Sequence, residues 1–280
     1  MEPEPYDWWP IVEDALAEDI GHGDVTSGCL SPDLLVDWHI EAQSEGFVCG
    51  VGIAEHLLGP YGSDPDQSAI TAEKVDGDHV RRGDIVIQGR QLARRVMSAE
   101  RTTLNFLMHL SGVATLTAQF VGKVQGTDAK IVDTRKTLPG LRALEKYAVR
   151  CGGGHNHRMG LYDGILVKDN HIAAAGSIRQ AVEAIRSYAS HMSKIEVECE
   201  SLEDVQAAIE AGAEAVLLDN MDPFMMREAV QRFGDKCLIE ASGGISLDTV
   251  AGVAKTGVAL ISVGQITHSA PALSFHLEIG

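Results

Sequence analysis

Residues 133–171 read DTRKTLPGLRALEKYAVRCGGGHNHRMGLYDGILVKDNH, and two short apolar runs lead into polar clusters at the start and end of this stretch. Ile131-Val132 precedes Asp133-Thr134-Arg135-Lys136, and Ile165-Leu166-Val167 precedes Lys168-Asp169-Asn170-His171. In both places aliphatic residues stop at a group of cations and hydrogen-bonding side chains. A buried parallel strand has this pattern when its carboxyl end opens into a ligand site. The stretch therefore predicts two strands of a parallel sheet with functional side chains at their ends.

The charge of this stretch is opposite in sign to that of the whole chain. The 280 residues carry 23 Lys and Arg against 40 Asp and Glu, a net charge of −17. Residues 133–170 carry seven Lys and Arg against four acids, a net charge of +3. Positive charge concentrated on an acidic protein indicates a pocket for a small anion, because a nucleic-acid binder needs a broad basic face. Arg142, Lys146 and Arg150, spaced four apart, are instead predicted to lie on the solvated face of a helix.

Composition places the chain among ordinary globular proteins, with 45% hydrophobic and 22% charged residues. Its length suffices for one large α/β domain, or for a barrel with a smaller companion. No apolar run approaches the roughly 20 residues of a membrane helix, and the acidic start MEPEPYDWWP lacks a basic leader pattern. The five cysteines form no CxxC pair, which favours reduced thiols over a disulfide framework or a zinc site. We therefore expect a cytoplasmic protein with neither a membrane nor a nucleic-acid partner.

The first half of the chain predicts a mixture of helices and short strands. Residues 7–20 have the apolar spacing of a helix, and residues 18–26 predict a structured loop. Short strands are predicted within 39–52, 68–75 and 84–89, with a helix near 54–58. Residues 91–125 are predicted to form two helices separated near Ser111-Gly112. Arg101 lies in this region and, on the pattern alone, is an ordinary surface arginine.

After Lys130 the chain alternates between apolar runs and segments with helical periodicity. The runs are 130–132, 164–167, 194–198, 214–218, 237–241 and 258–263, and the helical segments are 177–190, 201–211, 224–233 and 246–256. This alternation predicts successive right-handed βαβ units and a parallel sheet. The number of units, and the absence of a GxGxxG motif after the first strand, favour a barrel that is closed or nearly so. A barrel gathers its chemistry at the carboxyl ends of its strands.

The expected strand ends carry cations, acids and glycines. The cations are Arg135, Lys136, His157, Arg158 and Lys168. Glu198 and Asp219 could share a divalent metal or bind sugar hydroxyls, but Glu196 points the same way as Glu198, and ion pairs with the cations are an alternative. Ser242-Gly243-Gly244, predicted to open a helix, suits a phosphate together with Gly264, although a plain turn is the alternative. These groups predict a site for a phosphosugar and an anionic acid.

Five segments resemble the quinolinate phosphoribosyltransferase family, also called nicotinate-nucleotide pyrophosphorylase (carboxylating): 15–27, 98–115, 133–172, 195–221 and 239–279. The most specific motifs are DTRKTLPGLR (133–142), GGGHNHR (152–158) and KDNHI (168–172). The likeness covers nearly the whole chain and is weakest at about 40–90. It implies an N-terminal α/β sandwich domain over 1–112 and an open, seven-stranded α/β barrel over 113–280. The C-terminal tail is able to return to the first domain in this arrangement.

The resemblance also implies an activity, a cofactor and a set of site residues. Quinolinate and phosphoribosyl pyrophosphate would give nicotinate mononucleotide, CO₂ and pyrophosphate, with Mg²⁺, in de novo NAD biosynthesis. Arg135, His157, Arg158 and Lys168 would grip the two carboxylates of quinolinate, and Arg101 would enter the site of the partner subunit in an obligate homodimer. Lys136, Glu198 and Asp219 would face phosphoribosyl pyrophosphate and its metal; with Lys168 they form the expected catalytic set. Ser242, Gly243, Gly244 and Gly264 would hold the 5′-phosphate with His268, and Thr134, Val263 and Gln265 complete the expected site.

His155 departs from the family pattern, in which an apolar residue is common at that position. Three alternatives remain. A molybdenum-transport-associated homologue of the same fold is disfavoured by the intact KDNH and HNHR motifs. Nicotinate phosphoribosyltransferase would grip one carboxylate, for which four cations are excessive. A non-catalytic phosphosugar sensor is disfavoured by Glu198 and Asp219, and a turnover assay distinguishes it from an enzyme.

Overall fold

The computed structural model describes residues 5–59 and 69–280, and the chain divides into two compact units. Unit 1 comprises Met1–Ala118, Leu138–Gly153 and Ser269–Gly280, and unit 2 comprises Gln119–Thr137 and Gly154–His268. Both units are therefore assembled from stretches that are separate in the sequence. The domain boundary predicted between 112 and 113 lies inside a single long helix of the structure.

Unit 1 contains a four-stranded antiparallel sheet in the order β12-β1-β5-β3. These strands are β1 (Leu35–Ala42), β3 (Ala69–Ala72), β5 (Ile85–Leu92) and β12 (Phe275–Ile279), and β2 (Gly46–Phe47) pairs separately with β4 (His79–Val80). In β1 every second residue, Trp38, Ile40 and Ala42, is buried, as the two-residue period of a half-buried strand requires. The predicted strand 68–75 corresponds to β3, and its first residue, Ser68, lies outside the described residues.

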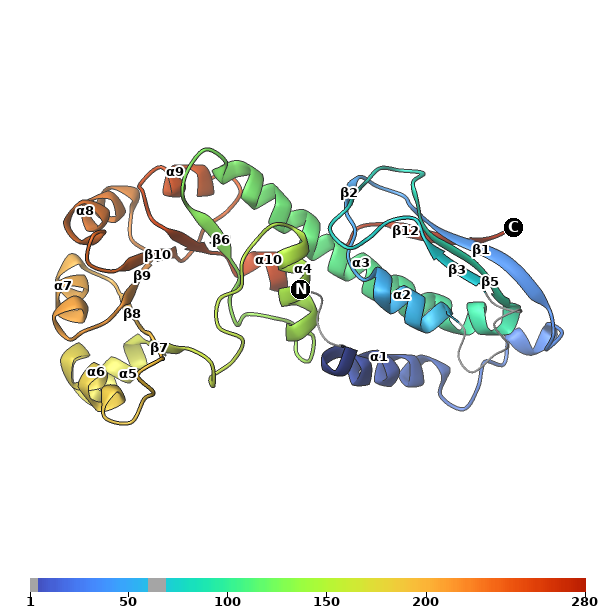
Figure 1. Cartoon of the computed structure of the whole chain (residues 1–280), viewed down its shortest axis with the longest axis horizontal. Coiled ribbons are helices and arrows are strands. Elements are labelled where there is room, and N and C mark those ends of the chain that lie inside the picture. Colours follow the sequence, from blue (N-terminus) through green and yellow to red (C-terminus); the bar gives the residue numbers. More distant parts are fainter. Residues whose placement is uncertain (1–4, 60–68) are drawn as a thin grey trace. The chain divides into compact units, whose positions relative to one another are not determined.

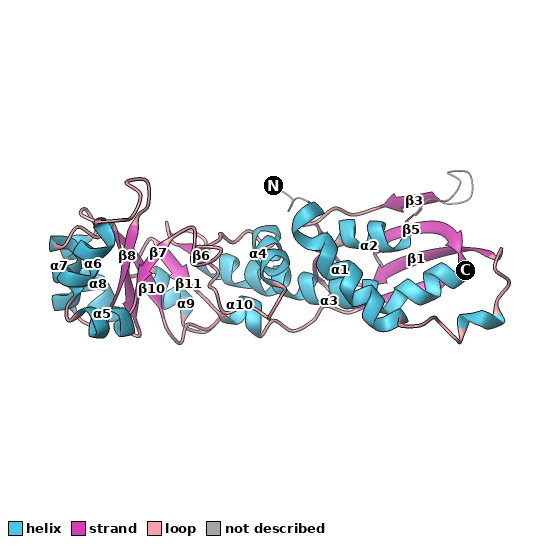
Figure 2. Ribbon diagram, turned by 90° about the horizontal axis from the view of Figure 1, so that it is seen from below, coloured by secondary structure: helices cyan, strands magenta, loops and turns pink. Residues whose placement is uncertain are grey.

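The helices of unit 1 are α1 (Pro5–Ile20), the short 3₁₀ helix η1 (Ser27–Cys29), α2 (Val51–Leu58), α4 (Arg142–Cys151) and the first part of α3 (Ala93–Val124). Figure 2 shows α2 beside the sheet, and α2 packs on β5. Within α4, Lys146 is fully buried. The prediction that this lysine solvates an outer helix face is therefore wrong, because a spacing of four residues identifies a common face but not its surroundings.

α3 is one continuous helix, so the predicted separation near Ser111-Gly112 is wrong. These residues are contact points instead. The Ser111 hydroxyl accepts a hydrogen bond from the Cys49 N–H at 2.9 Å, and a Cβ on Gly112 would lie 2.2 Å from the Pro271 carbonyl oxygen. By length and composition α3 could cross a membrane, but 61% of its most apolar window is buried. That burial is typical of a core helix.

Unit 2 contains a six-stranded parallel sheet in the order β6-β11-β10-β9-β8-β7. The strands are β6 (Lys130–Val132), β7 (Ile165–Val167), β8 (Ile195–Cys199), β9 (Ala215–Asp219), β10 (Leu238–Ser242) and β11 (Leu260–Ser262). Figure 1 shows the row of strands curving, with α7, α8 and α9 on its outer side. An isolated parallel bridge joins Val132 to His155 next to β6. The predicted parallel α/β sheet is confirmed by this arrangement.

The helices of unit 2 are α5 (Asp169–Ala175), α6 (Ile178–Arg186), α7 (Leu202–Glu210), α8 (Pro223–Phe233), α9 (Val250–Ala254) and α10 (Gln265–His268). Three of them begin at side-chain caps: Ser177, Ser201 and Asp222 each accept a backbone N–H of the following turn. Pro223 follows Asp222 at the first helical position, where its missing N–H costs nothing. These local signals fix where each helix leaves the sheet, and so leave the strand ends open for a site.

Candidate active site

A cavity of about 470 Å³ opens at the carboxyl ends of the strands of unit 2. Its lining includes eleven of the predicted site residues: Thr134, Arg135, Lys136, His157, Arg158, Lys168, Glu198, Asp219, Ser242, Gly243 and Gly244. The parallel register explains why, because Glu198, Leu217 and Glu240 are paired across β8, β9 and β10 and their side chains point to the same face. Parallel pairing thus brings residues that lie far apart in the sequence to one wall.

The cationic wall is positioned by backbone contacts of the polar loops. Asp133 is fully buried and its carboxylate accepts the His157 N–H at 2.9 Å, which ties the GGGHNHR loop to the end of β6. Arg158 donates from Nη1 to the Gly164 carbonyl oxygen at 3.0 Å. Burial, and next the positive charge of Arg135, lower the pKa of Arg158. Two guanidinium groups close enough to repel each other form a site that an anion would stabilise.

The acidic wall lies on β8 and β9. Glu198 is nearly buried, and its carboxylate accepts a hydrogen bond from the half-exposed Lys168 ammonium at 2.7 Å. Asp219 ends β9, and its Oδ2 accepts from the Asn220 amide at 2.9 Å. Glu196 does not line the cavity and contacts His157 Nε2 at 3.0 Å. Of the two glutamates that the sequence could not rank, Glu198 is therefore the one that faces the cavity.

The glycine turn closes the far side of the cavity. Gly243 and Gly244 have φ of +93° and +59°, and a Cβ on Gly243 would lie 2.2 Å from Asn220 Oδ1. Glycine is therefore required at position 243, both for its conformation and for the close approach. The prediction that this turn opens a helix is wrong, because α9 begins only at Val250 and residues 247–249 form an intervening turn. The exposed amides belong to a loop and not to a helix end.

Family comparisons agree with this geometry. Residues 113–278 match the model of the quinolinate phosphoribosyl transferase C-terminal domain, and residues 24–111 match that of the N-terminal domain. The chain belongs to the quinolinate phosphoribosyltransferase family. A probable nicotinate-nucleotide pyrophosphorylase [carboxylating] of Bacillus subtilis is 43% identical over 262 residues, covering 94% of this chain and 90% of the relative. The corresponding Mycobacterium leprae protein is 42% identical over 271 residues, covering 95% and 94%.

Solved structures agree with the sequence comparison. The structure of nicotinate-nucleotide pyrophosphorylase from Francisella tularensis has a TM-score of 0.91 at 35% identity, and covers 100% of this chain and 98% of that one. The human nicotinic acid phosphoribosyltransferase has a TM-score of 0.62 at 12% identity, which shows a shared fold alone. Within the quinolinate phosphoribosyltransferase family, the likeness therefore extends over both units of the chain.

Five predicted site residues do not line the cavity of this family member: Arg101, Val263, Gly264, Gln265 and His268. Gly264 still belongs to its surroundings, because a Cβ there would lie 3.0 Å from Lys136 Cδ and 3.3 Å from His268 Nε2. The Thr267 hydroxyl donates to the Lys136 carbonyl oxygen at 2.6 Å, which holds the two segments together. Arg101 belongs to α3 in unit 1, where its side chain is 60% exposed and 3.9 Å from Glu100.

The family motifs missed five lining residues: Leu166, Leu217, Asn220, Glu240 and Ser262. Two-residue alternation was the available signal, because Glu240 precedes Ser242 by two positions on β10 and so shares its face. Asn220 has φ of +53°, the only positive φ of a non-glycine residue in the described part of the chain. It follows Asp219 directly, and its N–H donates to the Ser242 carbonyl oxygen at 3.0 Å.

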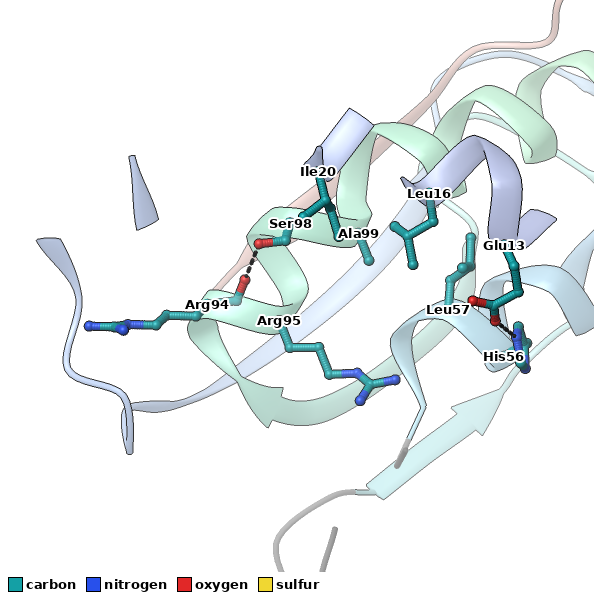
Figure 3. Close-up of a pocket in the computed structure, with 9 residues that line it drawn as sticks. All are labelled: Glu13, Leu16, Ile20, His56, Leu57, Arg94, Arg95, Ser98 and Ala99. Atoms are coloured by element: carbon teal, nitrogen blue, oxygen red, sulfur yellow. Dashed lines mark hydrogen bonds and ion pairs between the residues drawn. The ribbon is translucent and has the colours of Figure 1, made fainter. Parts of the chain in front are cut away.

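Unit 1 contains a cavity of a different kind, of about 420 Å³, lined by residues of α1, α2 and α3 (Figure 3). Figure 3 shows Glu13 directed at His56, and these side chains are 2.8 Å apart. Leu16, Leu57 and Ala99 supply an apolar wall. The lining lacks the glycine turn and the opposed walls of cations and acids found in unit 2, so the unit 2 cavity is the candidate active site of this phosphoribosyltransferase.

Proposed function

We propose that the chain transfers the phosphoribosyl group of phosphoribosyl pyrophosphate to the ring nitrogen of quinolinate, with release of CO₂ and pyrophosphate, giving nicotinate mononucleotide for NAD synthesis. One observation carries this proposal: cations, acids and a glycine turn share the unit 2 cavity. The cations can pair with the two carboxylates of a pyridine diacid, and the acids can accept hydrogen bonds from ribose hydroxyls. The backbone N–H groups of the glycine turn can donate to a phosphate. The family membership and the relatives' names support the same reaction.

Quinolinate binds against the cationic wall. Arg135 and Arg158 offer planar forks that match carboxylates, and Lys168 adds a point charge at the edge of the acidic wall. His157 completes this wall through its ring. Human nicotinic acid phosphoribosyltransferase shares only the fold, and nicotinate has one carboxylate, so a wall with three cations, Arg135, Arg158 and Lys168, favours the dicarboxylate.

Phosphoribosyl pyrophosphate binds across the cavity. The 5′-phosphate lies on Ser242, Gly243 and Gly244, with Gly264 and His268 beside it, because glycines let a phosphate approach backbone N–H groups closely. Lys136 extends toward the same region, because a Cβ at Gly264 would lie 3.0 Å from Lys136 Cδ. Thr134 accepts the Lys136 N–H at 2.9 Å and so holds the loop that presents this lysine. Val263 and Gln265 flank Gly264 and shape its backbone.

Glu198 and Asp219 are the residues that would hold Mg²⁺, because carboxylate oxygens are the ligands it prefers and both face the cavity from neighbouring strands. When bound there, Mg²⁺ would supply positive charge next to the pyrophosphate leaving group. The same carboxylates stabilise positive charge that develops at the ribose carbon C1 as the ring nitrogen attacks. Once the nitrogen is quaternised, Arg135 and Arg158 need only orient the adjacent carboxylate. Its bond to the ring then breaks to release CO₂, and the electron pair left on the ring carbon takes up a proton from water.

Two finer features of the architecture belong to this proposal. The six-stranded sheet corresponds to an open barrel of seven positions, the seventh being the backbone at His155 that bridges to Val132. The sheet and helices of unit 1 correspond to an α/β sandwich. The enzyme acts in the cytoplasm, as its acidic composition and five free cysteines favour.

The proposal is tested by incubating the protein with quinolinate, phosphoribosyl pyrophosphate and Mg²⁺ and measuring CO₂ and pyrophosphate. Equal amounts of both products, dependent on both substrates, are expected. Replacing quinolinate with nicotinate is the control, and comparable turnover with nicotinate would reassign the substrate. Binding of either substrate without turnover would identify a sensor instead of an enzyme.

The enzyme acts as a homodimer in which Arg101 of one subunit completes the site of the other. The exposure of Arg101 and its absence from the cavity of its own unit 2 support this assignment. Arg101→Ala and Lys168→Ala should each be inactive alone, yet regain up to a quarter of the activity when mixed and allowed to exchange, since one site in four then combines two intact contributions. Proven exchange without recovery would contradict the assignment.

A further inference from the structure

Glu240 lies in the middle of β10 and is fully buried, yet it lines the cavity. Neither of its carboxyl oxygens has a hydrogen-bond partner among the described residues. Its Oε2 is 3.7 Å from His157 Nε2, and His157, Glu196 and Glu240 bring three polar atoms within 4.8 Å of one another. A buried carboxylate without donors is costly, so its charge must be compensated or absent.

The hydrogen bonds of His157 determine where its proton lies. The Arg158 N–H donates to Nδ1 at 2.7 Å, so Nδ1 carries no proton. The Nε2–H therefore donates to Glu196 Oε2 at 3.0 Å. It is not available to Glu240, whose Oε2 lies 3.7 Å from the same nitrogen.

A metal ion does not fit this arrangement, although two carboxylates and a histidine are a possible ligand set. A cation would need the lone pair of His157 Nε2, and the ring proton would then have to lie on Nδ1. Nδ1 already accepts the Arg158 N–H. A proton on Glu240 removes its charge without disturbing either hydrogen bond of the histidine.

The charges around the cavity show what that proton does. Four cations line it: Arg135, Lys136, Arg158 and Lys168. Glu198, Asp219 and Glu240 line it as well, and Glu196 lies next to Glu240 behind the wall. With all three lining acids ionised the cavity has a net charge of +1, which is less than the two negative charges of a dicarboxylate. With Glu240 protonated the net charge is +2, which matches them.

We propose that Glu240 is a positioning and specificity residue that stays a neutral carboxylic acid beneath the substrate, so that a pyridine dicarboxylate can bind above it. This inference rests on the proposed function. Loss of the proton would place a third negative charge in the lining and weaken the binding of quinolinate, while leaving the transfer chemistry of bound substrate unchanged.

The surroundings of Glu240 support a proton at neutral pH. Burial, and next the charge of Glu196, raise the pKa of Glu240 to about 7. The titratable groups that face it are Glu196 of β8, His157 of the polar loop and Asp133 at the end of β6, and Ser262 of β11 adds a hydroxyl. His157 and Ser262 lower the pKa but do not offset burial and the two acids. Quinolinate binding should therefore weaken above about pH 7.

The test compares wild type with Glu240→Gln, whose amide has the shape of the protonated acid. Initial rates of pyrophosphate release are measured from pH 5.5 to 9 at saturating phosphoribosyl pyrophosphate, and quinolinate binding is measured in parallel by calorimetry. In wild type the KM for quinolinate should rise up to tenfold per pH unit above the pKa of Glu240, with kcat nearly constant. In Glu240→Gln this rise should be absent, so that its KM at pH 8.5 is at least tenfold below that of wild type.

Two further variants control this comparison. Glu145→Gln changes the other fully buried glutamate, in unit 1, and should keep the wild-type pH profile. Glu240→Asp keeps a titratable group and should keep the alkaline rise in KM, which also covers the case in which Glu240→Gln fails to fold by circular dichroism.

Several outcomes would overturn the inference. These are a wild-type KM that does not change with pH, a Glu240→Gln profile like that of wild type, or a lower kcat at unchanged KM, which would give the proton to the chemical step. Stoichiometric binding of Mn²⁺ or Zn²⁺ that is lost in Glu240→Gln would assign the cluster to a cation. Absence of turnover by wild type would instead reject the proposed function. The pH dependence of quinolinate binding, measured by calorimetry, would then still show whether Glu240 must be protonated for binding.

Discussion

Two fully buried glutamates, Glu145 in unit 1 and Glu240 in unit 2, occupy opposite kinds of surroundings. Glu145 accepts from the Leu138 N–H at 3.1 Å and contacts His109 Nε2 at 2.9 Å, so both of its oxygens are used by the fold. Glu240 makes no hydrogen bond of normal geometry among the described residues, because the nearby Ser262 hydroxyl donates to the Ala241 carbonyl oxygen, and it borders the cavity. A buried acid with a structural role is hydrogen-bonded by neighbouring groups of the protein. A buried acid that lacks such hydrogen bonds and lies beside a cavity indicates a functional role.

The largest expected effect comes from replacing a cation of the same cavity. It should appear in the affinity for quinolinate and not in the free energy of unfolding. Arg135→Ala should weaken quinolinate binding by about 2–5 kcal/mol, because it leaves a carboxylate without its charged partner. Titration calorimetry measures this loss. Arg135→Lys is the matched control and should recover only part of the affinity, since an ammonium lacks the planar fork. If Arg135→Ala instead unfolded the protein, the distinction between fold residues and cavity residues would fail.

Replacing Glu145, the buried acid whose oxygens are both hydrogen-bonded, should instead reduce stability and leave quinolinate binding nearly unchanged. Glu145→Ala should lower the free energy of unfolding by about 2–4 kcal/mol, because it leaves His109 and the Leu138 N–H without an acceptor and opens a cavity in α4. Urea unfolding measures this change. The KM for quinolinate of the folded fraction should stay within about threefold of wild type. Glu145→Gln keeps the volume and should lose less; an unchanged unfolding midpoint in Glu145→Ala would show that the two hydrogen bonds contribute nothing.

The same contrast explains what the sequence could predict. The strand–helix alternation after Lys130 and the polar groups at the strand ends are local patterns, and the parallel sheet follows from them. Glu240 was missed because it sits inside an apolar run, between Ile239 and Ala241, where a strand interior is expected. Its two-residue spacing from Ser242 indicates a shared face, but the pairing of β10 with β9 and β11 is needed to show that this face lines the cavity.

Other errors have the same physical origin. The spacing of Arg142, Lys146 and Arg150 identifies one helix face, but tertiary packing decides that Lys146 is buried. Ser111-Gly112 has a composition that often ends helices, yet the close approach of Pro271 requires a small residue there. The pairing of β12 with β1 is the return of the C-terminal tail that the family resemblance allowed, whereas the inclusion of Leu138–Gly153 in unit 1 was not predicted and depends on tertiary contacts. Local periodicity carries no information about such contacts.

The smallest expected effect is the change in the free energy of unfolding when Glu240 is replaced. Replacing Glu240 should stabilise the protein at neutral pH, whereas replacing Glu145 should destabilise it. The pKa of Glu240 is raised from the ordinary 4.5 to about 7, so the folded state binds the proton more tightly than the unfolded chain does. Wild-type stability should therefore contain a contribution that is present below about pH 4.5, falls as the pH rises to about 7, and stays constant above. Glu240→Gln does not titrate and lacks this loss.

Relative to wild type, the free energy of unfolding of Glu240→Gln should increase by on the order of 1–3 kcal/mol between pH 4.5 and 7. Urea unfolding at four or five pH values measures the difference, in which titrations shared by both proteins cancel. A difference that does not vary with pH would mean that Glu240 ionises as an exposed acid does. In that case the buried acid of unit 2 would be as well compensated as that of unit 1, and the contrast between them would no longer mark a functional residue.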